Sequence, residues 1–219
     1  MALSHHWLNL ASAAPRLVMP LLVATQLSTV TNAYFFAALL LVTFAHIVPS
    51  HLATALFAIA GGDRSTLTRE LRRTLGIFAA ISVAAPVGCV VAGSVLLGTF
   101  GAGYDTAATA LTIMACGTFA TGVKSYYASV ARINGDLERA VAVSCWGSGL
   151  EIAAACLALA LGGGIEALAL AWVAAMTVQG AILWPVIAVA GDLPGRPRAN
   201  APRWMRWVAP RTMSRSAHR

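Results

Sequence analysis

The chain has 219 residues, of which 58% are hydrophobic and 11% are charged, and its formal net charge is +7. This composition excludes an ordinary water-soluble domain, because the few charged residues fall in clusters between apolar stretches of about twenty residues. Such continuous stretches are typical of transmembrane helices, and they differ from the alternating pattern of a membrane β-barrel. We therefore expect an all-α, multi-pass protein of the cell membrane.

Six apolar spans follow one another along the chain. We place them at residues 7–29, 33–60, 75–98, 106–130, 139–162 and 165–190. Between spans two and three, residues 63–74 combine leucines four residues apart with several arginines, which predicts an amphipathic helix along the cytoplasmic surface. Residues 1–191 are thus predicted to form one six-helix transmembrane lobe. Residues 192–219 are predicted to form a flexible basic tail rich in Pro, Arg and Trp.

The charge of the connections predicts the orientation of the spans. Lys and Arg residues occur in the connections after spans two and four and in the C-terminal tail, whereas the other connections have none. Because basic residues accumulate on the cytoplasmic side, we expect both termini in the cytoplasm. Topology thereby explains the positive charge. No nucleic-acid recognition fold accompanies it, so we do not expect nucleic acid as a partner.

Three ionisable residues inside the spans are the main candidate site residues: Arg16, Lys124 and Glu151. Glu151 is twelve residues past Arg139, about 18 Å along a helix, and so near the middle of a hydrocarbon core about 30 Å thick. Arg16 and Lys124 fall in the cytoplasmic half. Because a charge at mid-bilayer costs about 3 kcal/mol or more, such residues normally face the interior of a bundle and have partners. We expect the three to line one cavity.

The roles of these three residues follow from their charges. Arg16 and Lys124 are predicted to bind an anionic head group, and Glu151 either pairs with one of them or titrates as an ion-coupling carboxylate. Structural alternatives remain open. Glu151 could be a neutral acid that is hydrogen-bonded to a neighbouring helix, and Arg16 and Lys124 could extend to the membrane interface along their apolar stems.

The segment HIVPSH places His46 and His51 on either side of Pro49. Proline inside a span favours a helix break, and we predict that the two histidines line the cavity beside it. Five residues apart, they project about 140° from each other on a helix and do not suit a shared metal ion. The sequence contains no catalytic motif that we recognise, so we expect neither an enzyme nor a bound cofactor or metal ion.

Three segments resemble a known protein family most clearly, and a weaker resemblance to the same family extends over residues 15–190. They are IVPSHLATALF (Ile47 to Phe57), FGAGYDTAA (Phe100 to Ala108) and SVARINGD (Ser129 to Asp136). With the Arg-rich helix between spans two and three, this arrangement resembles the C-terminal half of polysaccharide-biosynthesis flippases. These belong to the multidrug/oligosaccharidyl-lipid/polysaccharide exporter superfamily.

The resemblance implies a carrier of the cell envelope that moves a lipid-linked oligosaccharide or polysaccharide precursor across the cytoplasmic membrane by alternating access. Flippases of this family have two six-helix lobes around a cavity that is often cationic, and Arg16 and Lys124 match its general character. Only one lobe is expected here. The implied partners are the lipid-linked glycan, membrane lipids and a second lobe from another copy or a separate chain. The alternative is a non-transporting membrane scaffold, or a truncated remnant, that interacts with polysaccharide-assembly proteins.

Overall fold

Helices make up nearly all of residues 2–59 and 64–190, which are the residues that the computed structural model describes. They are α1 (Ala2–Gln26), α2 (Thr29–Ile59), α3 (Arg64–Gly98), the 3₁₀ helix η1 (Tyr104–Ala107), α4 (Ala108–Cys116), α5 (Thr118–Asn134), α6 (Leu137–Ala160) and α7 (Ile165–Ala190). These ranges contain no strand, so the predicted all-α class is confirmed for them. The predicted tail, residues 192–219, lies outside the described residues.

Five of the described helices are long and apolar enough to cross a membrane: α1, α2, α3, α6 and α7. The predicted fourth span is not a single helix. It is divided at Gly117 into α4 and α5, which are bent by 41° relative to each other. If this bent pair is counted as one span, the number of candidate spans rises to six. Several described helices could therefore cross a membrane, as predicted, but they do not form six unbroken spans.

The break at Gly117 has a local cause in the backbone. The Gly117 N–H donates to the carbonyl of Met114, three residues back, at 3.0 Å, which tightens the last turn of α4. The Thr118 hydroxyl then donates to the carbonyl of Ala115 at 2.7 Å. Glycine has a low helix propensity, and a hydroxyl that bonds to the preceding turn favours bending. The apolar pattern of the sequence reported the length of this span but not its bend.

The predicted surface segment is continuous with the third span. Residues 64–98 form one helix of 35 residues, α3, without an interruption near residue 75. Leucine and arginine spacing correctly indicated helix over residues 64–74, but they could not show whether a turn separates that helix from the apolar span. Residue 63 lies outside the described residues.

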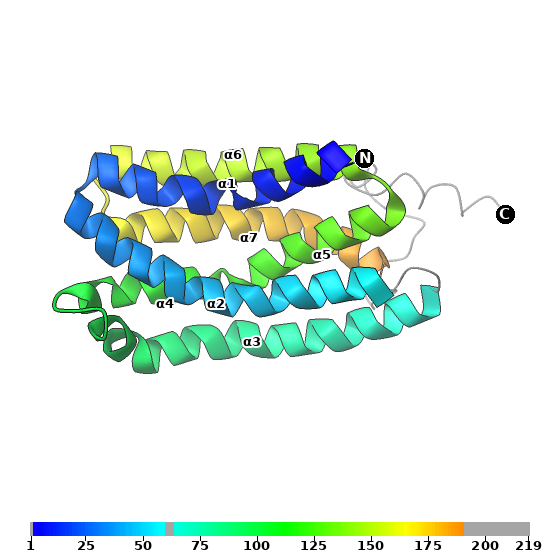
Figure 1. Ribbon diagram of the computed structural model, residues 1–219, viewed down its shortest axis with the longest axis horizontal. Helices are drawn as coiled ribbons and strands as arrows, with labels where there is room; N and C mark the ends of the chain where they lie inside the picture. The colour runs from blue at the N-terminus through cyan, green and yellow to red at the C-terminus, as the bar shows by residue number, and fades with distance from the viewer. Residues whose placement is uncertain (1, 60–63, 191–219) are drawn as a thin grey trace.

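The helices run lengthwise beside one another (Figure 1). α1 packs against α6 and α2, α7 packs against α6, α5 and α4, and α2 also contacts α5. α3 lies on the outside of the bundle against α4 and α2. Half of the apolar span of α7 is buried, compared with 11% of that of α3, so α7 is central and α3 peripheral. A buried bond from the Ser148 hydroxyl to the carbonyl of Ala11, at 2.6 Å, joins α6 to α1.

The helix ends follow ordinary capping rules. Ser28 accepts a hydrogen bond from the Thr31 N–H at 3.0 Å and so caps the start of α2. Gly135, with φ 75°, ends α5 in the left-handed conformation, and its N–H bonds back to the last turn. The connections 27–28, 99–103 and 161–164 contain no Lys or Arg. They lie together at the end of the bundle opposite to the first residues of α1 (Figure 1).

Candidate functional site

A cavity of about 320 Å³ lies between α1, α2, α5, α6 and α7. Its lining is unusually polar for the interior of such an apolar chain. The charged lining residues are Arg16, Lys124, Arg132 and Glu151, and the hydroxyl-bearing ones are Ser12, Ser50, Thr121, Ser125 and Ser129. Asn9, His46, Trp172 and Met176 also line it. Polar side chains from helices far apart in sequence therefore share one internal space.

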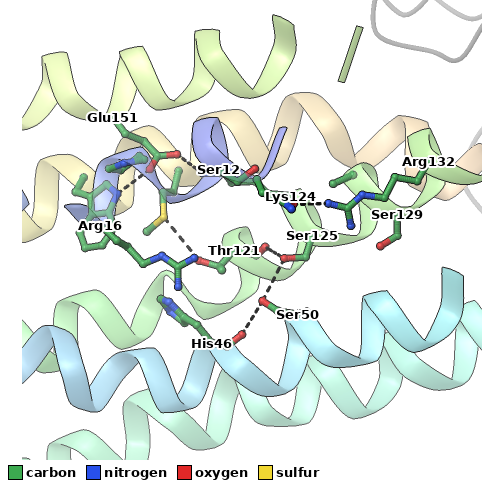
Figure 2. Close-up of a pocket in the computed structure, with 15 residues that line it drawn as sticks. Ser12, Arg16, His46, Ser50, Thr121, Lys124, Ser125, Ser129, Arg132 and Glu151 are labelled. Carbon is green, nitrogen blue, oxygen red and sulfur yellow. Dashed lines mark hydrogen bonds and ion pairs between the residues drawn. The ribbon is translucent and has the colours of Figure 1, made fainter. Parts of the chain in front are cut away.

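Three lining residues lie at the same depth in the bundle. Arg16 is fourteen residues past the start of α1 and Glu151 is fourteen past the start of α6, about 21 Å along each helix. His46 is thirteen residues before the end of α2, about 20 Å from the same end of the bundle. Matching depths on neighbouring helices bring these side chains into one layer. Figure 2 shows Arg16 and His46 close together, with Glu151 on the other side of the cavity.

The carboxylate of Glu151 has a partner for each oxygen. Lys124 forms an ion pair with Oε1, and the indole nitrogen of Trp172 donates a hydrogen bond to Oε2 at 2.8 Å. Glu151 is 1% exposed, and the side chain of Lys124 is 17% exposed. A buried carboxylate is tolerated when a cation and a further hydrogen bond compensate its lost hydration. Lys124 therefore points inward to Glu151 rather than outward to the membrane interface.

Arg16 differs from Lys124 because it is a cation without an acidic partner. Its side chain is partly buried and lines the cavity, yet it forms no hydrogen bond or ion pair with any residue that the structure describes. Its guanidinium extends toward His46 and Thr121 (Figure 2). His46 is 2% exposed, and within residues 2–59 and 64–190 its Nε2 atom has no hydrogen-bond partner. Two nitrogen-bearing side chains are thus left unsatisfied side by side.

Hydroxyl groups form the wall between α2 and α5. Ser50 bonds to the carbonyl of His46 at 2.9 Å and lies 3.4 Å from the Ser125 hydroxyl. Ser125 bonds in turn to the carbonyl of Thr121 at 3.1 Å. Each hydroxyl that donates to a backbone carbonyl keeps lone pairs for another donor. This wall can hydrogen-bond a polar ligand without adding charge.

Arg132 lies at the end of the cavity nearest to the start of α1 (Figure 2). Its Nη2 atom donates to Oδ1 of Asn9 at 2.7 Å, an exposed contact that joins α5 to α1. Arg132 is two residues from the end of α5. The polar lining therefore extends from mid-bundle to this end.

The lining carries an excess of positive charge. The three cations Arg16, Lys124 and Arg132 against the single carboxylate of Glu151 give a formal charge of +2 when His46 is neutral. Charges that are partly shielded from water act on one another more strongly than they do in bulk water. The cavity is thus suited to an anion. Over the described parts of the chain, no three His, Cys, Asp or Glu residues are grouped in a way that could hold a metal ion.

Most of the predicted site residues come together in this cavity, with two differences. Arg16, Lys124, Glu151 and His46 all line it. His51 is exposed and is not part of the lining. The expected helix break at Pro49 is wrong, because α2 continues as one helix from Thr29 to Ile59. A membrane helix tolerates one missing backbone hydrogen bond when neighbouring helices support it, and α2 is held by α1 and α5.

Among the lining residues that the sequence does not predict, Trp172 and Arg132 matter most, because one contacts Glu151 and the other adds a charge. Trp172 is not conspicuous in the sequence, because tryptophan is common in membrane helices. A buried acid on the preceding span nevertheless needs a hydrogen-bond donor at the same depth in the membrane. α6 and α7 are joined by a short turn, and Glu151 and Trp172 are nine and seven residues from its two ends. Similar distances from a short turn were therefore the signal that could have indicated this pair. Arg132 was interpreted only as a topology signal.

No protein-family model, curated protein or solved structure matches the chain. The chemistry of the cavity is therefore the basis for inferring a function.

Proposed function

We propose that the chain is a membrane carrier, or one lobe of a carrier, whose cavity binds the anionic group of a lipid-linked oligosaccharide or polysaccharide precursor during its translocation by alternating access. The observation that supports this proposal most directly is the unpaired Arg16 facing a cavity of net positive charge. A partly buried guanidinium without an anionic partner is costly unless a ligand supplies the negative charge.

The chemistry of Arg16 favours a phosphate group as the ligand. Guanidinium binds phosphate through two parallel hydrogen bonds, which gives both affinity and orientation. Lys124 lies in the same cavity, and the hydroxyls of Ser50 and Ser125, which donate to backbone carbonyls, can accept hydrogen bonds from sugar hydroxyls. A lipid-linked glycan joined through phosphate offers phosphate oxygens to the two cations and, next to them, sugar hydroxyls to the serines.

The distribution of charge along the bundle indicates the side from which the substrate enters. The cavity extends toward the end of the bundle that carries Arg132 and the start of α1, and the connections at the opposite end have no Lys or Arg. By the positive-inside rule, the end with the basic residues is cytoplasmic, which also places both termini there. Precursors made in the cytoplasm would enter from that end. A second lobe, from another copy or a separate chain, would complete the path.

The proposal is tested by binding of a short-chain polyprenyl diphosphate to the purified protein in lipid nanodiscs. Replacing Arg16 by Ala removes a charge-assisted contact, so we expect affinity to fall about 10- to 100-fold. Arg73→Ala is the matched control, because Arg73 is exposed on α3 and does not line the cavity. Undiminished binding by the Arg16 variant, or an equal loss in both variants, would contradict the proposal.

A cellular test separates this function from the scaffold alternative. In the native host, Arg16→Ala should block glycan export while the protein remains in the membrane. A scaffold that recruits partners through its basic tail would behave in the opposite way. Removing residues 192–219 would then abolish export and Arg16→Ala would not.

A further inference from the structure

Lys124 can face two anions, Glu151 and a ligand in the cavity, but it cannot fully neutralise both. We propose that an anionic ligand displaces Glu151 from Lys124 and that Glu151 then takes up one proton, so that binding in the cavity is coupled to proton uptake. This inference rests on the proposed function, because it assumes that the cavity binds an anion. It adds the coupling ion and the two residues that exchange partners.

The exchange balances in charge. The Lys124 ammonium keeps its charge, gives up its contact with Glu151 Oε1 and forms one with a ligand oxygen. The proton comes from solution and forms an O–H bond on the carboxyl group. Arg16 remains available as the first contact for the ligand, since it has no ion-pair partner among the described residues.

Burial decides which member of the pair moves. The Lys124 side chain is 17% exposed, whereas Glu151 is 1% exposed. Lys124 lines the cavity, and its ammonium group is carried on a flexible four-carbon chain that can change direction. Trp172 is 2% exposed and belongs to a large buried apolar cluster, so its N–H stays at Glu151 Oε2. When Lys124 turns to a ligand, the carboxylate keeps a single neutral donor. A buried carboxylate in that state is stabilised by protonation.

The other charged groups around Glu151 do not replace Lys124. α1 contributes Arg16, α2 contributes His46, and α5 contributes Arg132 in addition to Lys124. The charged residue of α7 is Glu166, in its first turn and away from the cavity lining. Of these groups, only Lys124 forms an ion pair with Glu151 in the described chain. His46 is a second titratable group in the cavity, and the experiment must therefore separate it from Glu151.

The probe for the test is a prenyl sulfate, because a sulfate monoester keeps its charge where phosphate would titrate. Its affinity for the full-length protein in nanodiscs is compared at about pH 5 and about pH 8. Linkage of one proton to binding allows up to about a tenfold gain in affinity for each unit of falling pH. We expect this gain in the wild type. A pH indicator should also report about one proton taken up per bound probe in weakly buffered solution.

Glu151→Gln identifies the group that carries the proton. Gln can still accept the hydrogen bond from Trp172, and it releases Lys124 permanently. We expect binding that is as tight as that of the wild type at low pH, without pH dependence and without proton uptake. Retention of the wild-type pH dependence would assign the proton to another group such as His46 and overturn the exchange.

A second variant keeps the inference testable if Glu151→Gln does not fold. Trp172→Phe removes one donor from the carboxylate, which should make Glu151 easier to protonate and move the pH dependence of binding to higher pH. An unchanged pH dependence would overturn the exchange, and Arg73→Ala should match the wild type.

The outcomes separate the inference from the proposed function. Binding that requires Arg16 but does not vary with pH would leave the proposed function standing and overturn the exchange. Absence of binding at any pH by the folded wild type would overturn both.

Discussion

The side-chain amide of Gln179 on α7 lies directly against the backbone of Gly147 on α6, in the space that a Cβ atom at residue 147 would occupy. Both residues are buried. Close approach of two helices at glycine is a common source of stability where lipid provides no hydrophobic drive for association. Glu151 is one turn further along α6, so this contact also supports the position of the carboxylate.

Gly147→Ala should destabilise the protein by about 1 to 3 kcal/mol, because the new methyl group must displace Gln179. Gly149→Ala, two residues along the same helix, is the control. A Cβ atom there would meet nothing within 4 Å, so we expect no loss of stability. Unfolding of both variants in mixed detergent micelles measures the difference. Equal stability of the two variants would contradict the packing at this crossing.

A second close contact predicts non-additive substitutions. The ring of Phe78 on α3 fills the space beside Gly122 on α5, so Gly122→Ala alone should lower the stability. In a Phe78→Leu background the smaller side chain leaves room, and the same substitution should cost less by about 1 kcal/mol or more. A double-mutant cycle on unfolding free energy tests this expectation. Additive effects would mean that the two residues do not meet.

Breaking the Lys124–Glu151 pair from either side should have unequal effects. Lys124→Met leaves a carboxylate that is 1% exposed with the Trp172 N–H as its remaining donor, and we expect a loss of about 3 to 5 kcal/mol at neutral pH. Glu151→Gln should cost less, because Lys124 can reach the cavity. The double variant, Lys124→Met with Glu151→Gln, should recover most of the stability of the first. A double variant less stable than Lys124→Met alone would argue against the pair.

The cavity should admit water and favour small anions. In a variant without the four native cysteines, Ser125→Cys should react with a negatively charged methanethiosulfonate several times faster than with a positively charged one, because the lining has a formal charge of +2. Added salt should reduce this difference.

Val91→Cys is the control for accessibility. Val91 is 77% exposed on α3, but in a bilayer it would face acyl chains rather than water. We therefore expect little reaction with either reagent at this position. Faster labelling at residue 91 than at residue 125 would mean that water reaches the outside of α3 and not the cavity.

Much of the fold could be predicted because lipid restricts the chain to a few options. Continuous apolar runs of this length have to form helices, and the predicted spans agree with α1, α2, α6 and α7 to within a few residues. The bend at Gly117 was not predictable in the same way. It depends on one backbone bond to Met114 and on the fit beside Met176, whose methyl would lie 2.6 Å from a Cβ at residue 117.

The candidate site was predictable to the extent that charge is costly in lipid. That cost alone favours a position of Arg16, Lys124 and Glu151 in one cavity, and all three line the cavity in the structure. It does not determine which cation pairs with the acid. That choice follows from how α5 and α6 face each other, and sequence periodicity does not report the rotation of one helix against another.

α3 is longer than a membrane is thick. Its 35 residues extend about 52 Å, whereas the hydrocarbon layer of a bilayer measures about 30 Å. In a membrane, several turns of this one rod would therefore stand in the aqueous phase, and its sequence puts the arginine-rich turns at the starting end. This projecting end of α3 would limit how deeply the bundle inserts into the membrane, because deeper insertion would move guanidinium groups into the hydrocarbon layer.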